Sequence, residues 1–185
     1  MEVIFLKKTK KGGASGQYRW AFTVFLMAVV LSAVLSLLSE SILDGAGMVV
    51  AVLILIAFIA LGIVFDVIGV ATTAADPRPF HSMAAHREKG AKEALLLLRN
   101  ASRVSSVCND VVGDICGIVS GATGAVIVTR LQQAFSLESV LVSVGVTALI
   151  SGLTIGGKAL SKTFAMKQST RVVYWVGRFL HLFHR

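Results

Sequence analysis

The chain has 185 residues, of which 55% are hydrophobic and 15% charged, and its formal net charge is +8 at pH 7. Its mean hydropathy is +0.79. Soluble domains contain about 45–50% apolar and about 25% charged residues. The composition therefore excludes a soluble globular protein and indicates an all-α integral membrane protein.

The chain opens on a basic arm, residues 1–19, which carries five Lys and Arg residues. Residues 20–38 then form an apolar run without any charged residue. A signal peptide would have a shorter apolar core and a small-residue cleavage site after it. We therefore expect the run 20–38 to be a retained transmembrane helix.

Three further apolar runs follow, at 48–70, 104–128 and 140–157. A transmembrane helix needs about 20 residues at 1.5 Å per residue, so the first two are long enough to span a bilayer. The run 140–157 is shorter and ends in glycines, which is typical of a span packed against its neighbours. The sequence thus predicts four transmembrane helices.

The basic residues indicate how these spans are oriented. Seventeen of the 18 Lys and Arg residues lie in the arm 1–19, in the segment 76–103 or in the tail 158–185. The remaining loops carry Glu40, Asp44 and Glu138 instead. The positive-inside rule predicts a multi-pass protein of the plasma membrane with both termini in the cytoplasm. The positive net charge then follows from topology, and no nucleic-acid partner is expected.

Two segments outside the spans have the pattern of helices that lie on a membrane surface. From Phe80 to about residue 100, after two prolines, apolar residues repeat at helical spacing. The tail 158–185 combines aromatic and basic residues in a similar way. We expect both segments to bind anionic lipid headgroups; the alternative for the helix 80–100 is a protein partner. His181 and His184 are interpreted as interfacial residues in preference to a metal site.

Three aspartates lie within the predicted spans: Asp66, Asp110 and Asp114. An ionised carboxylate in hydrocarbon costs roughly 2.5–3.5 kcal/mol on insertion scales, so an unpaired one is rare. Asp110 and Asp114 are four residues apart on one helix face, and Asn109 beside them offers an amide oxygen. Counted by helical rise, all three carboxylates fall in the cytoplasmic half, near enough to line one cavity.

Like charges as close as Asp110 and Asp114 require a proton, a basic partner or a bound cation. Lys158 and Arg103 are the candidate basic partners. On the same helix, Gly113, Gly117 and Gly121 repeat every four residues, which lets another helix approach closely. That face is expected to serve packing within the chain or dimerisation, and the short span 140–157 is the other candidate dimer surface. Nothing in the sequence has the spacing of a nucleophile–base set, a phosphate loop or a zinc site, so no enzyme activity is expected.

Several stretches resemble the transmembrane domain of the CNNM/CorB/CorC magnesium-transporter family. Residues 65–71, Phe-Asp-Val-Ile-Gly-Val-Ala, are similar to the family's Ser-x-x-Glu-x-Ala pattern at the end of the first core span. Residues 83–95 are similar to its Leu-Ala-x-x-Gly-x-x-x-Ala helix, and residues 157–169 to its Gly-Glu-x-x-Pro-Lys-x-x-Ala segment. The resemblance covers about residues 48–185.

The resemblance implies three core spans, a juxtamembrane helical region, a homodimer and export of a divalent cation. Magnesium is the first candidate ion and cobalt the second, with sodium as coupling ion. In the family, magnesium is held by polar side chains of the first two core spans. On this sequence the resemblance and the residue chemistry together nominate four metal ligands: Asp66, Asp110, Asp114 and Asn109.

The sequence departs from the family pattern at the residues that carry its chemistry. The family's Ser falls on Asp66 and its Glu on Gly69, while its Gly-Asn falls on Gly113-Asp114. The acidic residue of the third core span is Lys158, and its proline is Ser161. Aspartate oxygens remain competent magnesium ligands.

The alternative function is that of a non-transporting family member, which acts as a membrane scaffold or regulatory subunit. The CBS pair that often follows this domain is not found in these 185 residues, so regulation through it is not expected within the chain.

The charge distribution makes a testable prediction of topology. Reporter fusions at Asp44 and Phe135 are expected to report the external side of the membrane, and fusions at Gly90 and Arg185 the cytoplasm, because basic loops are retained inside. Compartment-specific reporter activity measures this directly. An external signal at Arg185 would contradict the four-span topology.

Overall fold

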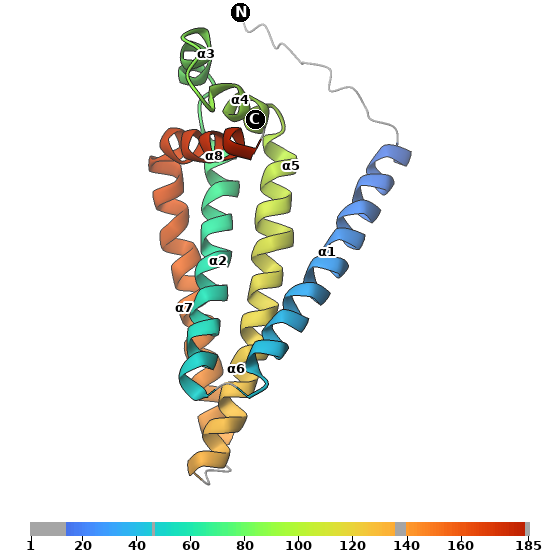
Figure 1. Ribbon diagram of the computed structural model, residues 1–185, viewed down its shortest axis with the longest axis vertical. Helices are drawn as coiled ribbons and strands as arrows, with labels where there is room; N and C mark the ends of the chain where they lie inside the picture. Colours follow the sequence, from blue (N-terminus) through green and yellow to red (C-terminus); the bar gives the residue numbers. More distant parts are fainter. Residues whose placement is uncertain (1–13, 46, 136–139, 184–185) are drawn as a thin grey trace, which may run out of the picture.

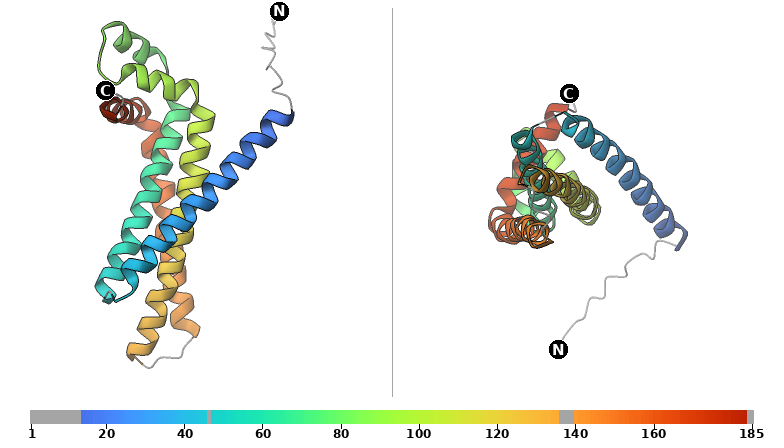
Figure 2. Two further views of the ribbon diagram at one scale, coloured as in Figure 1. Left: turned by 45° about the vertical axis from the view of Figure 1, so that its right-hand side comes forward. Right: turned by 90° about the horizontal axis from the view of Figure 1, so that it is seen from below.

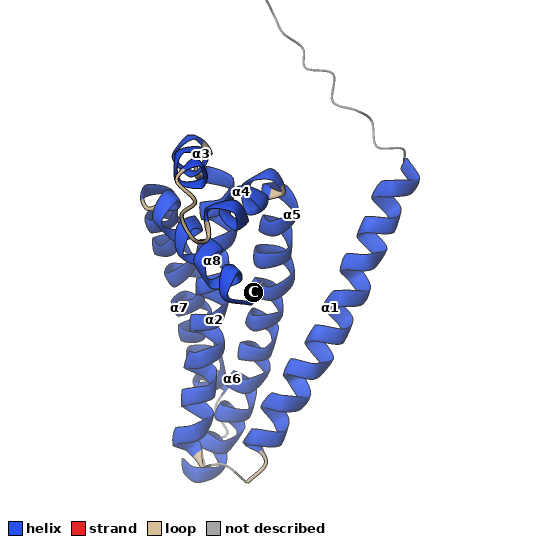
Figure 3. Cartoon of the chain, turned by 45° about the horizontal axis from the view of Figure 1, so that its top comes forward, coloured by secondary structure: helices blue, strands red, loops and turns tan. Residues whose placement is uncertain are grey.

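The computed structural model (Figure 1) describes residues 14–45, 47–135 and 140–183, and these residues form helices and loops without any strand (Figure 3). In chain order the helical segments are α1 (Ala14–Leu43), α2 (Met48–Ala74), α3 (Arg78–Ala85), α4 (Ala91–Arg99), α5 (Ala101–Ser105), η1 (Ser106–Gly113), α6 (Asp114–Phe135), α7 (Val140–Lys167) and α8 (Ser169–Phe183).

Among the described residues, four helical stretches are long and apolar enough to cross a membrane: 18–43, 48–74, 101–134 and 140–167. They confirm the predicted all-α membrane domain with four spans. The third stretch is one continuous rod made of α5, η1 and α6 (Figure 1). All four extend beyond the predicted apolar runs, because the polar residues that flank each run continue the helix.

Helix α2 is the centre of the bundle and contacts η1, α6, α7 and α8. Close approach depends on glycines: a Cβ atom on Gly62 would lie 3.2 Å from the Cβ of Cys116 on α6. A Cβ atom on Gly157 of α7 would lie 2.6 Å from Cδ1 of Ile63 on α2. In lipid, the burial of apolar surface drives helices together only weakly, so the bundle depends on dispersion forces between closely packed atoms. Small residues allow the helices to approach closely enough for this packing.

Helix α1 leans across the bundle and packs on one side of α6 (Figure 2). Val24, Ala28, Leu31 and Leu35 pack against a buried row on η1 and α6 that includes Val111 and Ile115. Near the α1–α2 turn, Ser39 Oγ and Thr123 Oγ1 share a buried hydrogen bond of 3.2 Å. Arg130 Nη2 also donates to the Leu43 carbonyl at 2.7 Å, which satisfies one of the open carbonyls at the end of α1.

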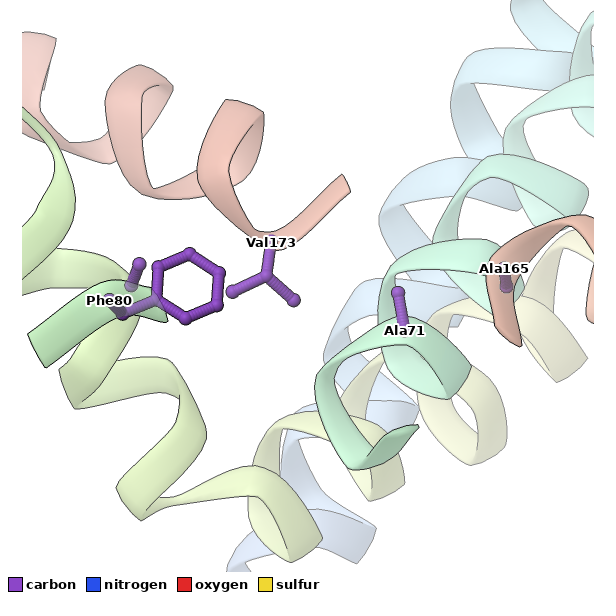
Figure 4. Close-up of a cluster of buried hydrophobic side chains, with 5 residues drawn as sticks. Ala71, Phe80, Ala165 and Val173 are labelled. Carbon is purple, nitrogen blue, oxygen red and sulfur yellow. The ribbon is translucent and has the colours of Figure 1, made fainter. Parts of the chain in front are cut away.

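The short helices α3 and α4 and the amphipathic helix α8 form a layer across one end of the bundle, here called the α8 end (Figure 1). Five elements bury one side chain each in its core: Ala71 of α2, Phe80 of α3, Ala94 of α4, Ala165 of α7 and Val173 of α8. The ring of Phe80, which is fully buried, points toward Val173 (Figure 4). This cluster fixes the layer to the ends of α2 and α7.

The single helix predicted over 80–100 is wrong: the structure has two helices, α3 and α4, with a turn between them. The backbone at Arg87 and Gly90 is left-handed, with φ of 58° and 88°; a left-handed residue such as Arg87 follows the end of an α-helix, and Gly90 directly precedes α4. Gly90 also has no room for a side chain, because a Cβ atom would lie 2.6 Å from the backbone of Arg178 on α8. The break therefore lets α8 cross α4 at close range.

Candidate cation site

The polar side chains buried in the bundle are nearly all hydrogen-bonded. Among the described residues these are Ser39, Asp66, Thr72, Ser120, Thr123 and Ser161. Five of them are hydroxyls, and each hydrogen-bonds to a carbonyl in its own helix or to another hydroxyl. Asp66 is the exception: it is 5% exposed, and its Oδ2 atom has no hydrogen-bond partner.

A second buried oxygen without a partner lies on the facing helix. Asn109 of η1 donates from Nδ2 to Ser105 Oγ at 3.3 Å, while its Oδ1 atom has no partner. This amide lies directly on Gly69 of α2, because a Cβ atom there would be only 2.0 Å from Asn109 Oδ1. Gly69 is three residues after Asp66 and shares its face of α2. The contact between α2 and η1 thus brings one carboxylate and one amide oxygen to the same buried seam.

The local backbone explains how Asn109 reaches this position. Residues 106–113 form a π-helix, which inserts a wider turn into the third span and shifts the register of the side chains around it. Such turns are common at functional sites. Asp66 itself lies eight residues before the end of α2, about 12 Å along the helix from its end, so the seam is within the apolar part of the span.

Asp110 and Asp114 lie on a different side of the third span from Asn109. Both are exposed, and Asp110 Oδ2 accepts a hydrogen bond of 2.9 Å from Ser106 Oγ. Asn109 Oδ1 is buried against Gly69 of α2, whereas the carboxylates of Asp110 and Asp114 are exposed, so they do not share its position. The expectation that three carboxylates line one cavity is therefore wrong: the described residues contain no cluster of three His, Cys, Asp or Glu side chains able to hold a metal ion.

Lys158 is the basic partner that the structure gives to Asp114. Its Nζ atom lies 3.9 Å from Asp114 Oδ1 and donates to the Gly113 carbonyl at 3.5 Å. Arg103, the other predicted partner, instead stacks over the ring of Trp20, 5.1 Å from its centre. The resemblance aligned Gly113-Asp114 with the family's Gly-Asn, which would place Asp114 against α2. In the structure Asn109 lies there instead, and Asp114 is exposed.

The structure also accounts for His181, one of the two tail histidines. Its Nδ1 atom lies 2.8 Å from Glu93 Oε1, a contact that ties α8 to α4. His184 lies outside the described residues. His181 is therefore part of the contact that holds the α8 end together, and the sequence pattern alone did not point to this pairing.

From the sequence, Asn109 ranked below the three aspartates as a ligand, and Gly69 stood only for the loss of a carboxylate. The available signal was spacing, since Gly69 lies one helical turn after Asp66 on the same face. Because Gly69 has no side chain, it leaves room beside the buried Asp66 for a polar group from another helix, here the amide of Asn109. The π-helix that delivers Asn109 has no comparable signal in the sequence.

One family model matches this chain, over residues 53–185, and its description is the cyclin M (CNNM) transmembrane N-terminal domain. The match includes α6, α7, α8 and the part of α2 that carries Asp66 and Gly69, whereas α1 lies outside it. No curated protein and no solved structure matches the chain.

The seam predicts a specific interaction between Gly69 and Asn109. Gly69→Ala is expected to destabilise the protein by about 1–3 kcal/mol, because the new methyl group overlaps the Asn109 amide. Thermal unfolding in detergent measures the change. Adding Asn109→Ala to Gly69→Ala should recover much of the lost stability, since it removes the overlapping atoms.

Gly152→Ala on α7 is the matched control, because a Cβ atom there meets nothing within 4 Å. It should be neutral or slightly stabilising, as alanine is favoured over glycine within helices. Equal melting temperatures for Gly69→Ala and Gly152→Ala would contradict the close contact at the seam.

Proposed function

The chain belongs to the CNNM transmembrane-domain family, and on this premise we propose that it binds and transports a divalent cation, magnesium first, at the seam between α2 and η1. Asp66 and Asn109 are the protein ligands of this proposal. The domain is associated with divalent-cation transport, and the chain is a multi-pass membrane protein whose core matches the family model.

The observation that carries the proposal is the pair of buried oxygens without partners, Asp66 Oδ2 and Asn109 Oδ1. A buried polar atom that lacks a hydrogen bond costs about 1–3 kcal/mol, and a charged group costs more. An ionisable side chain inside a span is by default a candidate for an ion pathway. A cation between α2 and η1 would satisfy both oxygens at once.

The chemistry of the two groups favours magnesium over softer metals. Mg²⁺ prefers oxygen ligands, and it is usually bound through one or two carboxylates while it keeps several waters. One carboxylate and one amide oxygen suit a partly hydrated ion in transit better than a permanently held one. Cobalt, which also binds imidazole and thiolate, is the second candidate ion, and sodium is the proposed coupling ion.

Asp110 and Asp114 have a different place in the proposal. Their carboxylates lie on the exposed face of the third span, where water or a second protomer would have to cover them inside a membrane. We propose that this face, which also holds Gly117 and Gly121, is the homodimer contact. A Cβ atom on either glycine meets nothing within 4 Å in the chain, so another helix has room to approach.

Lys158 favours the second candidate function, a scaffold or regulatory subunit without transport. Its ammonium group already contacts the Gly113 carbonyl and the Asp114 carboxylate, both of which are oxygen groups that a metal ion could use. The positive charge of Lys158 already balances the Asp114 carboxylate, so no metal ion is required at that point of the third span. In this alternative the seam at Asp66 binds no ion, and the protein acts through its contacts.

Magnesium binding predicts a linked change in stability. The free energy of unfolding of the wild-type protein should rise by about 2.7 kcal/mol at a magnesium concentration one hundred times the dissociation constant. Asp66→Asn should abolish this response, and it should stabilise the magnesium-free protein because a buried charge is removed. Thermal unfolding across a magnesium titration, with and without sodium, measures both effects.

Asp76→Asn is the matched control, since Asp76 is exposed and accepts a hydrogen bond from the Arg78 backbone outside the spans. It should leave the magnesium response unchanged. Asp114→Asn should also keep the response, because the Asp114 carboxylate is exposed and is paired with Lys158 of α7. A folded wild-type protein whose stability does not depend on magnesium would contradict the ion site and favour the scaffold.

The dimer contact predicts that Gly117→Leu weakens self-association, because the added side chain prevents close approach of a second helix. Cross-linking in detergent measures the dimer fraction. Gly145→Leu tests the other candidate surface, the fourth span, because its position on α7 is also open. A dimer fraction that is unchanged in Gly117→Leu would exclude this face.

A further inference from the structure

A groove lies under α8, at the point where this helix crosses the ends of α2 and α7. It has a volume of about 500 Å³. Its apolar walls include Val64 and Ile68 of α2 and Phe164 of α7, and Val172 and Trp175 of α8 cover it. Val64, Phe164 and Trp175 are more than half exposed, so the groove opens to the outside of the bundle.

The depth of the groove restricts what can occupy it. Its walls on α2 run from Ile63 to Ile68, which are eleven and six residues before the helix ends at Ala74. At 1.5 Å per residue these positions lie roughly 9–16 Å along the helix from its end. An opening at this depth of a transmembrane helix faces hydrocarbon, so the occupant must present an apolar chain.

The charges around the groove are of one sign. Residues 140–185, which include all of α7 and α8, contain six Lys and Arg residues and no Asp or Glu. Arg171 and Gln168 line the groove where α7 meets α8, and they bring a cation and an amide to its rim. The nearby acids do not oppose this charge: Glu93 contacts His181, and Asp66 is buried away from the groove.

We propose that this groove is a binding site for one anionic phospholipid. An acyl chain lies between α2 and α7 beneath α8, and its phosphate group is bound by Arg171 with Gln168 beside it. Trp175 marks the level of the interface, because tryptophan is favoured at the boundary between headgroups and hydrocarbon. The guanidinium of Arg178 lies 6.0 Å from the centre of its ring, which adds a second cation at that level.

The site has a structural consequence, because α8 also carries part of the core at the α8 end. Val172 and Trp175 face the groove, whereas Val173 between them is buried with Ala71 and Ala165. A lipid under α8 therefore supports the side of the helix that the protein leaves uncovered. Binding links the lipid composition of the membrane to the position of α8.

Quenching of Trp175 fluorescence by brominated lipids tests the proposal. The full chain carries Trp20→Phe, so that Trp175 is its one tryptophan, and is reconstituted in vesicles of phosphatidylcholine. Phosphatidylglycerol with brominated acyl chains should bind about fivefold more tightly than brominated phosphatidylcholine. This ratio corresponds to about 1 kcal/mol for one arginine near the membrane surface.

Matched variants separate a site from general attraction to a basic protein. Arg171→Gln should remove most of the preference, whereas Lys162→Gln should retain it, because Lys162 is exposed on α7 outside the groove. Val64→Phe should reduce quenching by both lipids, since it fills the groove, and its melting temperature verifies that it folds. Equal quenching by the two lipids, or an equal loss in Arg171→Gln and Lys162→Gln, would overturn the proposal.

Discussion

The close approach of α2 to the third span is the constraint on which the rest of this structure depends. Gly62 and Gly69 bring the two backbones together, and their spacing of seven residues keeps both on one face of α2. Because the helices meet so closely, Asn109 is placed against Gly69 beside Asp66. The same contact leaves the opposite side of the third span uncovered. The buried seam and the exposed face are therefore two results of one packing arrangement.

Hydropathy was sufficient to predict the membrane class and the four spans, because a bilayer imposes a length and a composition on every helix that crosses it. The region 80–100 could not be predicted in the same way. Its apolar spacing is helical throughout, but the chain turns at Arg87 and Gly90, where α8 approaches from far along the sequence. A contact between residues almost ninety positions apart thus decides a local break that periodicity cannot show.

The candidate site was predicted in part. Asp66 was found because a buried charge in a span stands out in any sequence, and Asn109 was predicted as a fourth ligand that ranked below the three aspartates. Which of these two adjacent residues faces α2 depends on a π-helical turn, whose register cannot be derived from the 3.6-residue period. The pairing of Asp114 with Lys158 was one of the alternatives considered, and geometry favours it over Arg103.

The cluster around Phe80 has a consequence for biosynthesis. Val173, which covers the Phe80 ring, is made 93 residues later, so at about 5–20 residues per second it follows by roughly 5–20 s. During that interval α3 and α4 have left the ribosome with an aromatic side chain uncovered. Helix α8 must therefore be made before this layer can close. Until then the nascent protein presents a surface that a chaperone or the membrane itself has to protect.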